Sequence, residues 1–311
     1  MKIKNFFHSK KSKSEKLRLF IIEKKIGRVK KLLNSDPKLV ANVYNEWDNI
    51  TPLNIVAAVG DVSMTNLFLE KGANVNAKGT DNITPLIKAA IKNNIDVAQI
   101  LIKNGADVNA SHHKEEGKNY LGLAAGTPLH WAAQSGNSSM AELLISNGAN
   151  IDPKCADGKT PLQYSLLSSA RYNVARILIE NGADIFIKDT EGKNLLHIIA
   201  NHLYTLLGKG NTDFTESFLS DERMAKLLIE KGIEINALDN KLCTPLILAC
   251  SKPFVNVELV KLLLDKNADA KLKDVSGKTA LQYAYNVKEQ ISSKLPEKYL
   301  ISLNQVIDLL S

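Results

Sequence analysis

Four side chains in one short polar stretch are of the types that bind metal ions. His112, His113, Glu115 and Glu116 lie within residues 111–120 and offer imidazole and carboxylate groups, which are ligands for zinc. Adjacent side chains on one loop seldom converge on a single ion. We therefore interpret the stretch as a solvated loop and predict neither a metal site nor a bound cofactor.

Two Gly-Lys-Thr triplets resemble the end of a phosphate-binding loop. They are Gly158-Lys159-Thr160 and Gly277-Lys278-Thr279. A phosphate-binding loop also requires a Gly five residues before its Gly-Lys pair, but Pro153 and Leu272 stand at those positions. The triplets are therefore interpreted as turns that lead into a helix, and no nucleotide site is predicted.

The remaining nucleophiles and bases form no catalytic pattern. The three cysteines, Cys155, Cys243 and Cys250, contain no Cys-x-x-Cys pair, and their odd number argues against a disulfide framework. They are expected to be small buried side chains in a reducing compartment. Outside the repeated sequence phrase described next, the chain has no Ser-His-Asp arrangement and no paired carboxylates of the kind that catalyse reactions. The chain is therefore predicted not to be an enzyme.

That recurring phrase, Thr-Pro-Leu or a near copy of it, returns seven times. The first residues of successive copies are separated by 33, 43, 33, 34, 50 and 35 positions, and a second marker, Gly-Ala or a near copy, follows each copy but the last. A period in this range is typical of stacked repeat proteins, in which length adds units rather than enlarging one core. The copies are Thr51-Pro52-Leu53, Thr84-Pro85-Leu86, Thr127-Pro128-Leu129, Thr160-Pro161-Leu162, Asn194-Leu195-Leu196, Thr244-Pro245-Leu246 and Thr279-Ala280-Leu281.

The third unit shows what one repeat contains. Thr127 stands where a helix N-cap belongs, and Pro128 takes the first helical position, where its missing N–H costs nothing. Gly136 is expected to end this first helix with a left-handed turn, and Gly148 to end a second helix. Two antiparallel helices and a short extended turn are therefore predicted for each repeat.

These residues resemble the ankyrin repeat family, whose pattern is Gly-x-Thr-Pro-Leu-His-x-Ala-Ala followed by Gly-Ala-Asp-x-Asn-Ala. Residues 105–110 reproduce the closing element, Gly-Ala-Asp-Val-Asn-Ala. The resemblance implies an all-α fold, an ankyrin repeat solenoid of about eight helix-turn-helix units with short β-hairpin fingers. It also implies that His130 and His197 bridge backbone groups of adjoining repeats.

The expected organisation is a basic flexible tail over residues 1–14 and a single solenoid over residues 15–311. The solenoid would comprise an N-terminal capping unit at 15–46, six central repeats at 47–278 and a C-terminal capping unit at 279–311. The two long intervals place insertions near 111–120 and 201–220. The second insertion is predicted to form a projecting helical hairpin, either a locally packed element or a partner-docking knob.

Ankyrin proteins usually bind protein partners on a concave surface made from the hairpin tips and the exposed ends of the first helices. In this chain the resemblance assigns the tip positions to Trp47, Asp48, Asp81, Leu123, Asp157, Glu191 and Lys241. It assigns the helix positions to Ile91, Lys92, Gln134, Leu167, His202 and Lys252. Trp47 is interpreted either as a binding anchor or as a cap on the first unit. We expect a monomer with a protein partner and no small-molecule substrate.

Positive charge is concentrated at the N-terminus. Residues 1–31 hold twelve Lys and Arg against two Glu, whereas the formal net charge of the whole chain is +7. The tail is interpreted as solvated, and contact with nucleic acid or an anionic membrane, or a role as a targeting or secretion address, are the alternatives. No apolar run approaches the ~20 residues that span a bilayer, so a cytoplasmic location is expected.

The favoured hypothesis is a non-catalytic protein–protein interaction scaffold. The second is a targeted adaptor or host-directed effector, because the chain is similar to ankyrin repeat proteins of intracellular bacteria, some of which are delivered into a host cell. In that case the basic N-terminus would direct the chain to a membrane, nucleus or secretion system. An enzyme is the third alternative.

Overall fold

The computed structural model describes residues 12–41, 50–79, 82–112, 126–166, 171–201, 215–291 and 297–311. The chain divides between Asp157 and Gly158 into two compact units. Within the described ranges all regular secondary structure is helical, which confirms the all-α prediction.

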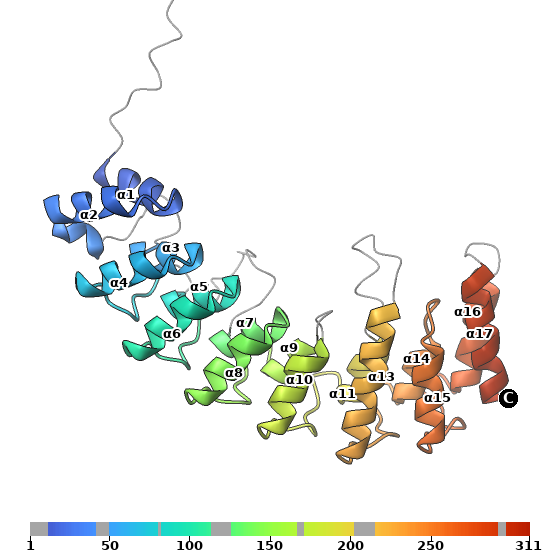
Figure 1. Ribbon diagram of the computed structural model, residues 1–311. Helices are drawn as coiled ribbons and strands as arrows, with labels where there is room; N and C mark the ends of the chain where they lie inside the picture. Colours follow the sequence, from blue (N-terminus) through green and yellow to red (C-terminus); the bar gives the residue numbers. More distant parts are fainter. Residues whose placement is uncertain are drawn as a thin grey trace, which may run out of the picture. The chain divides into compact units, whose positions relative to one another are not determined.

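The first unit consists of helices arranged in successive antiparallel pairs, with a short 3-10 helix after the first pair (Figure 1). Its elements are α1 (Lys13–Ile22), α2 (Ile26–Ser35), η1 (Pro37–Val40), α3 (Pro52–Val59), α4 (Val62–Glu70), α5 (Pro85–Lys92), α6 (Ile95–Lys103), α7 (Pro128–Gln134) and α8 (Ser138–Ser146). Helix α1 begins at Lys13, because Ser12 and Glu15 form a capping box. The ordered fold therefore starts slightly before the predicted end of the tail.

The second unit repeats this arrangement. Its helices are α9 (Pro161–Ser165), α10 (Arg171–Glu180), α11 (Leu195–Asn201), α13 (Thr215–Glu230), α14 (Pro245–Cys250), α15 (Val257–Asp265), α16 (Ala280–Ile291) and α17 (Glu297–Leu310). Helix α13 contains 16 residues, whereas α8 and α15 contain 9 each. The long second helix predicted for the larger insertion is therefore present, while residues 202–214, which would complete the hairpin, lie outside the described residues.

The recurring phrase sets the helix starts as predicted. The Thr84 and Thr244 hydroxyls accept hydrogen bonds from the N–H groups of Ile87 and Ile247 at 3.3 and 3.2 Å. Each Pro of the phrase occupies the first turn, where no N–H is needed. At the other end, Gly136 has a φ of 69°, the left-handed conformation expected there.

Neighbouring repeats stack helix against helix. In the first unit α3 packs on α5 and α5 on α7, while α4 packs on α6 and α6 on α8. In the second unit α11, α14 and α16 form one such row and α13, α15 and α17 form the other (Figure 1). The apolar core therefore runs continuously between repeats within each unit, as a solenoid requires.

Small residues in the first helices allow this close stacking. Leu129, Ala132 and Ala133 of α7 are fully buried, as are Leu86 and Ala89 of α5. Larger side chains from the second helices, including Phe68, Met64, Leu101 and Met140, fill the remaining space. The predicted inner face of a repeat is confirmed.

Asparagines at the end of three repeats tie each to the next. The Asn109 side chain donates from Nδ2 to the Gly148 carbonyl at 3.1 Å and accepts at Oδ1 from the Asn150 N–H at 2.8 Å. Asn76 and Asn236 make the same two contacts with the repeats that follow them. We call this contact the asparagine clamp.

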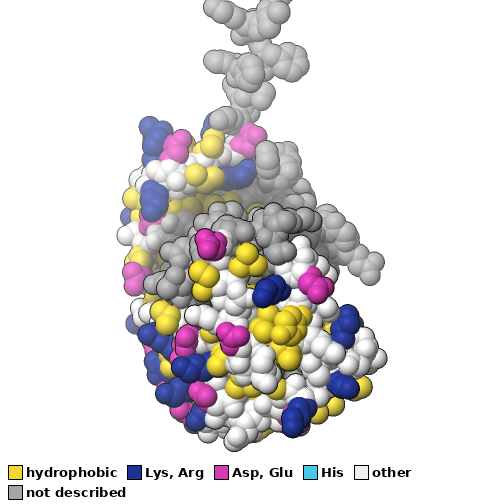
Figure 2. Space-filling view, turned by 90° about the vertical axis from the view of Figure 1, so that its right-hand side faces the viewer, with side chains coloured by type: hydrophobic (Ala, Val, Ile, Leu, Met, Phe, Trp, Pro, Cys, Tyr) yellow, Lys and Arg dark blue, Asp and Glu magenta, His cyan; other side chains and the backbone are white. Residues whose placement is uncertain are grey.

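The terminal repeats expose apolar side chains where a central repeat would have a neighbour. Ile22 and Ile26, which continue the helical pattern of the first unit, are 50% and 40% exposed. At the other terminus Leu303, Val306 and Ile307 of α17 are buried, while Tyr299 and Leu310 are half-buried. Figure 2 shows the face formed by the C-terminal helices, where yellow apolar side chains gather among scattered charges. The large exposed apolar residues described in α16 and α17 are Tyr285, Ile301 and Leu309.

The structure corrects the prediction for His112. Its side chain is buried rather than solvated, and its ring lies 5.4 Å from that of Trp131. The His112 N–H donates to the Gly126 carbonyl at 3.2 Å, and these two residues form an antiparallel β-bridge. This pairing with a residue fourteen positions later in the chain holds the His112 imidazole in a buried position. His113, Glu115 and Glu116 lie outside the described residues.

Candidate protein-binding surface

Three turns of the second unit share one geometry. The turns at 189–193, 239–243 and 274–278 each begin with an Asp whose N–H donates to the carbonyl four residues later, at 3.0, 3.1 and 3.1 Å. We call them the repeat turns. Each lies between the end of one repeat and the first helix of the next. They occupy the place of the predicted hairpin fingers.

The Asp side chain closes each repeat turn. Asp189 Oδ1 accepts hydrogen bonds from the N–H groups of Glu191 and Lys193, both at 2.9 Å. Asp239 and Asp274 do the same in their own turns, at 2.8 to 3.0 Å. Because the carboxylate takes the N–H that would otherwise complete a β-bridge, these turns are hairpin-like but contain no strand.

Hydrogen bonds between backbones join the repeat turns in a constant register. The Asn240 N–H donates to the Glu191 carbonyl at 2.9 Å, and the Val275 N–H donates to the Lys241 carbonyl at 3.0 Å. In both cases the second residue of one turn bonds to the third residue of the turn before it. The three tips are therefore held at fixed positions relative to one another.

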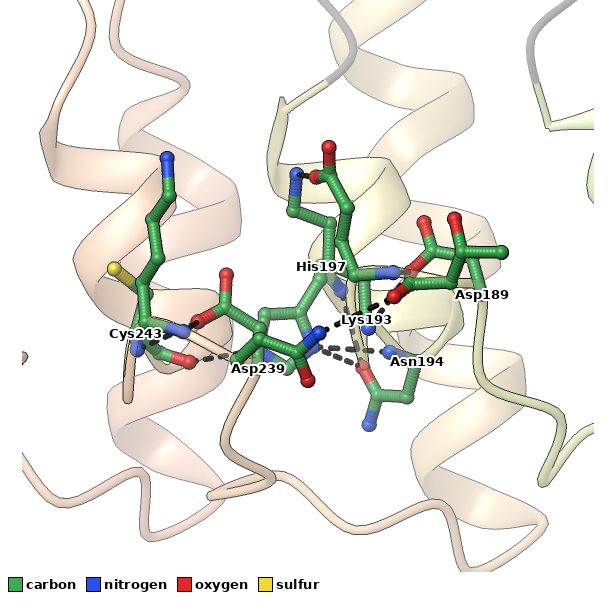
Figure 3. Close-up of polar contacts among 10 residues, drawn as sticks. Asp189, Lys193, Asn194, His197, Asp239 and Cys243 are labelled. Atoms are coloured by element: carbon green, nitrogen blue, oxygen red, sulfur yellow. Dashed lines mark hydrogen bonds and ion pairs between the residues drawn. The ribbon is translucent and has the colours of Figure 1, made fainter.

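Buried polar side chains anchor the turns to the helices beneath them (Figure 3). His197 is fully buried, and its Nε2–H donates to the Cys243 carbonyl in the next repeat at 2.9 Å. Its Nδ1 accepts from the Asn194 N–H at 3.2 Å. Burial lowers the pKa of His197 despite the bond to Cys243, so the ring is neutral at pH 7.

Asn54 makes a bridge of the same kind in the first unit. It occupies the same place in its repeat, and its Nδ2 donates to the Ile83 carbonyl of the following repeat at 2.6 Å. A side chain three residues after the N-cap thus links adjoining repeats in both units. The bridging role predicted for His197 is confirmed, while His130 is fully buried and bonded through Nδ1 to Thr127 of its own repeat.

The repeat turns also carry charges in close proximity. Glu191 and Lys193 form an ion pair. The hydrogen bond from Lys193 lowers the pKa of Glu191. Burial is the largest single influence on the pKa of Lys193 and lowers it, but the hydrogen bond to Glu191 and the negative charges of Glu191, Asp189 and Asp239 together outweigh burial, so the net shift is upward. Burial, and after it the positive charge of Lys193, lower the pKa of Lys252.

Family models of ankyrin repeats match most of the chain. A model of three ankyrin copies matches residues 19–112 and 113–189, and a model of many ankyrin copies matches residues 228–284. The chain belongs to the ankyrin repeat family. Ankyrin repeats are generally protein–protein interaction modules and typically non-catalytic.

A solved ankyrin structure has the same fold. The crystal structure of the human ASB11 ankyrin repeat domain superposes with a TM-score of 0.63 at 23% sequence identity, covering 84% of this chain and 98% of that domain. At this identity the likeness establishes the ankyrin fold alone. Among the described helices, none is both long and apolar enough to cross a membrane.

The structure brings together two of the predicted ankyrin contact residues. Glu191 and Lys241 are exposed on adjacent repeat turns, and half-buried Lys252 lies two residues after the end of α14. In the first unit, Ile91 and Lys92 end α5 and Gln134 ends the neighbouring α7; Lys92 is exposed and the other two are half-buried.

Asp157 is exposed, and its carboxylate accepts a hydrogen bond from the Cys155 thiol at 2.6 Å. Six predicted contact residues lie outside the described residues: Trp47, Asp48, Asp81, Leu123, Leu167 and His202.

Two exposed apolar residues of the repeat turns were not predicted. Leu242 and Val275 are 44% and 65% exposed. An alignment of the turns would have indicated Leu242, because Gly192 and Gly277 occupy the same place in the other two. Among the described residues, no cluster of three or more His, Cys, Asp or Glu side chains is arranged to hold a metal ion.

Proposed function

We propose that this chain is a non-catalytic scaffold whose protein partner binds the three repeat turns and the adjoining ends of the first helices. The constant register of backbone hydrogen bonds between the turns supports this proposal above all. The backbone that carries the exposed side chains is already ordered before a partner arrives. Binding then loses little conformational entropy, which favours affinity.

In the first unit, taken by itself, the first-helix ends are proposed to offer a partner surface of the same kind. Ile91 and Gln134 are half-buried there, so each offers part of its side chain to a partner without being free to reorient. The basic residues 1–11 lie outside the described residues, and no contact observed in the structure favours the targeted-adaptor alternative.

Site-specific photo-crosslinking tests the proposal. A photoreactive amino acid placed at Lys241 should capture a protein partner from cell lysate, whereas the same amino acid at Lys261 should not. Lys261 is an exposed lysine on α15 of the same repeat and therefore a matched control. Equal capture at both positions, or capture only at Lys261, would contradict binding at the repeat turns.

A further inference from the structure

Leu242 adopts a backbone conformation that its side chain disfavours. Its φ is 56°, in the left-handed region, whereas Gly192 and Gly277 have φ values of 75° and 74° at the same place in their turns. Glycine adopts this conformation without a steric penalty, but a residue with a Cβ does not. The turn geometry therefore calls for glycine at this position, and leucine is retained at a cost in stability.

The Leu242 side chain is only partly buried. It is 44% exposed, so much of its apolar surface remains in water. Backbone strain retained at a surface position is a feature of functional sites. The leucine is therefore better explained by an interaction with another molecule than by the stability of the repeat.

A second apolar side chain lies on the next turn. Val275 is 65% exposed, and its N–H donates to the carbonyl of Lys241, the residue before Leu242. This hydrogen bond fixes the two tips beside each other. Leu242 and Val275 thus present two apolar side chains on adjacent, rigidly joined turns.

The exposed charge around this pair is positive. The carboxylates of Asp239 and Asp274 are buried and bonded to N–H groups of their own turns. Glu191 is paired with Lys193. Lys241 and Lys278 are exposed, so cationic groups remain for an incoming partner.

Lys252 adds to the positive charge. It is half-buried on the loop after α14, where burial, and after it repulsion by the charge of Lys193, lower its pKa. An anionic group bound near these two lysines would relieve this repulsion. Charge complementarity therefore favours an acidic partner over a basic or neutral one.

We propose that Leu242 and Val275, with Lys241 and Lys278 on the same turns, bind an acidic protein segment that carries a large apolar side chain between its Asp or Glu residues. This inference rests on the proposed scaffold function and specifies the chemistry of its partner. Leu242 acts as the apolar anchor, and the lysines select for acidic flanks.

A display library of random twelve-residue peptides, selected on the full-length chain, tests the proposal. Selection should enrich peptides in which Asp and Glu flank Leu, Ile, Phe or Trp. Fluorescence anisotropy of an enriched peptide should show affinity that decreases as salt increases. Enrichment of basic peptides, of peptides without an apolar residue, or of none would overturn the proposal.

Variants of Leu242 separate binding from folding. Leu242→Gly relieves the backbone strain and should raise the melting temperature by about 2 °C. The same substitution should lower the affinity for the enriched peptide at least about tenfold. Leu242→Asn, which tolerates the left-handed conformation, should weaken binding similarly. Leu309→Ser removes a leucine of matched exposure, 43%, from α17 and should leave affinity unchanged.

The outcome also distinguishes this inference from the scaffold proposal. If Leu242→Gly binds the enriched peptide as tightly as the wild type while Lys241 still crosslinks to a partner, the acidic-segment inference fails and the scaffold proposal stands. If no partner crosslinks at the repeat turns, the scaffold proposal fails first.

Discussion

At the scale of single residues, the repeat turns depend on what occupies one left-handed position. A Cβ at Gly192 would lie 2.5 Å from Asn240 Oδ1, whereas a Cβ at Gly277 would have nothing within 4 Å. The two glycines have nearly the same φ, so they differ mainly in the neighbour that packs over them. Substitutions at Gly192 and Gly277 therefore distinguish the cost of backbone strain from the cost of the contact between turns.

Gly277→Ala should destabilise the second unit by about 1 kcal/mol, which is the cost of a Cβ in the left-handed region. Gly192→Ala should cost at least about 1 kcal/mol more, because Asn240 must also move. Urea unfolding followed by circular dichroism measures both. Equal midpoints for the two variants would show that the Asn240 contact contributes nothing.

His197 gives the second unit a pH dependence. Its pKa is lowered in the folded state from the ordinary value of 6.5, chiefly by burial, so the folded state favours the neutral ring. The stabilisation is complete above pH 6.5 and declines as pH falls toward the folded pKa, because the unfolded chain binds the proton first. Unfolding free energy should therefore decrease below about pH 6.5.

His197→Gln is the control for this effect, because Gln163 already occupies the same place in its own repeat and accepts the Thr160 N–H at 3.0 Å. The variant should lose the part of the pH dependence that lies just below pH 6.5. Parallel stability curves for wild type and variant between pH 5 and pH 7 would rule His197 out as the titrating group.

At the scale of elements, the asparagine clamp is absent where Phe186 replaces the asparagine. Phe186 is 64% exposed, yet its N–H donates to Asp184 Oδ1 at 2.8 Å, as the N–H of Asn109 does to Asp107 at 2.9 Å. The local backbone is therefore the one that supports a clamp. Only the amide side chain is missing.

Phe186→Asn should stabilise the second unit by about 1 kcal/mol, by supplying hydrogen bonds to the Gly232 carbonyl and the Glu234 N–H. Phe186→Ser provides the control, since it removes the exposed ring without replacing both amide groups. Thermal unfolding of the three proteins measures the difference. A serine variant as stable as the asparagine variant would assign the gain to the lost phenyl ring.

The sequence predicts elements better than it predicts contacts between them. Thr-Pro-Leu specifies its helix start through bonds within a few residues, so α5, α7 and α14 begin where expected. Burial of His112 depends on pairing with Gly126, and no local pattern signals such pairing. Leu242 was missed because the turns were not compared position by position; Gly192 and Gly277 stand at its place in the other two, and its φ of 56° shows the conformation that favours glycine. The charged tip residues of the candidate site, Glu191 and Lys241, were therefore predicted from the family resemblance. Its exposed apolar residues, Leu242 and Val275, were not predicted.

At the scale of the whole molecule, stability is divided among repeats that contact only their neighbours. In the first unit, α1 and α2 have a helical pair on one side alone, whereas α5 and α6 have one on both sides. Terminal repeats bury less surface and are expected to open first.

Hydrogen exchange should therefore show lower protection in α1 and α2 than in α5 and α6, and lower protection in α17 than in α15. Native-state exchange in sub-denaturing urea, read by mass spectrometry, resolves these segments. Uniform protection across all of them would mean that the repeats unfold as a single cooperative block.

The closure of each repeat turn by its own aspartate has a consequence for how such a protein can change. The side chains of Glu191 and Lys241 make no closing bond in their turns, because the Asp carboxylate and the backbone supply those bonds. Substitutions at these tips alter the charge and shape offered to a partner while the helices beneath stay the same. Specificity can therefore diverge, by selection or by design, independently of the stability of the fold.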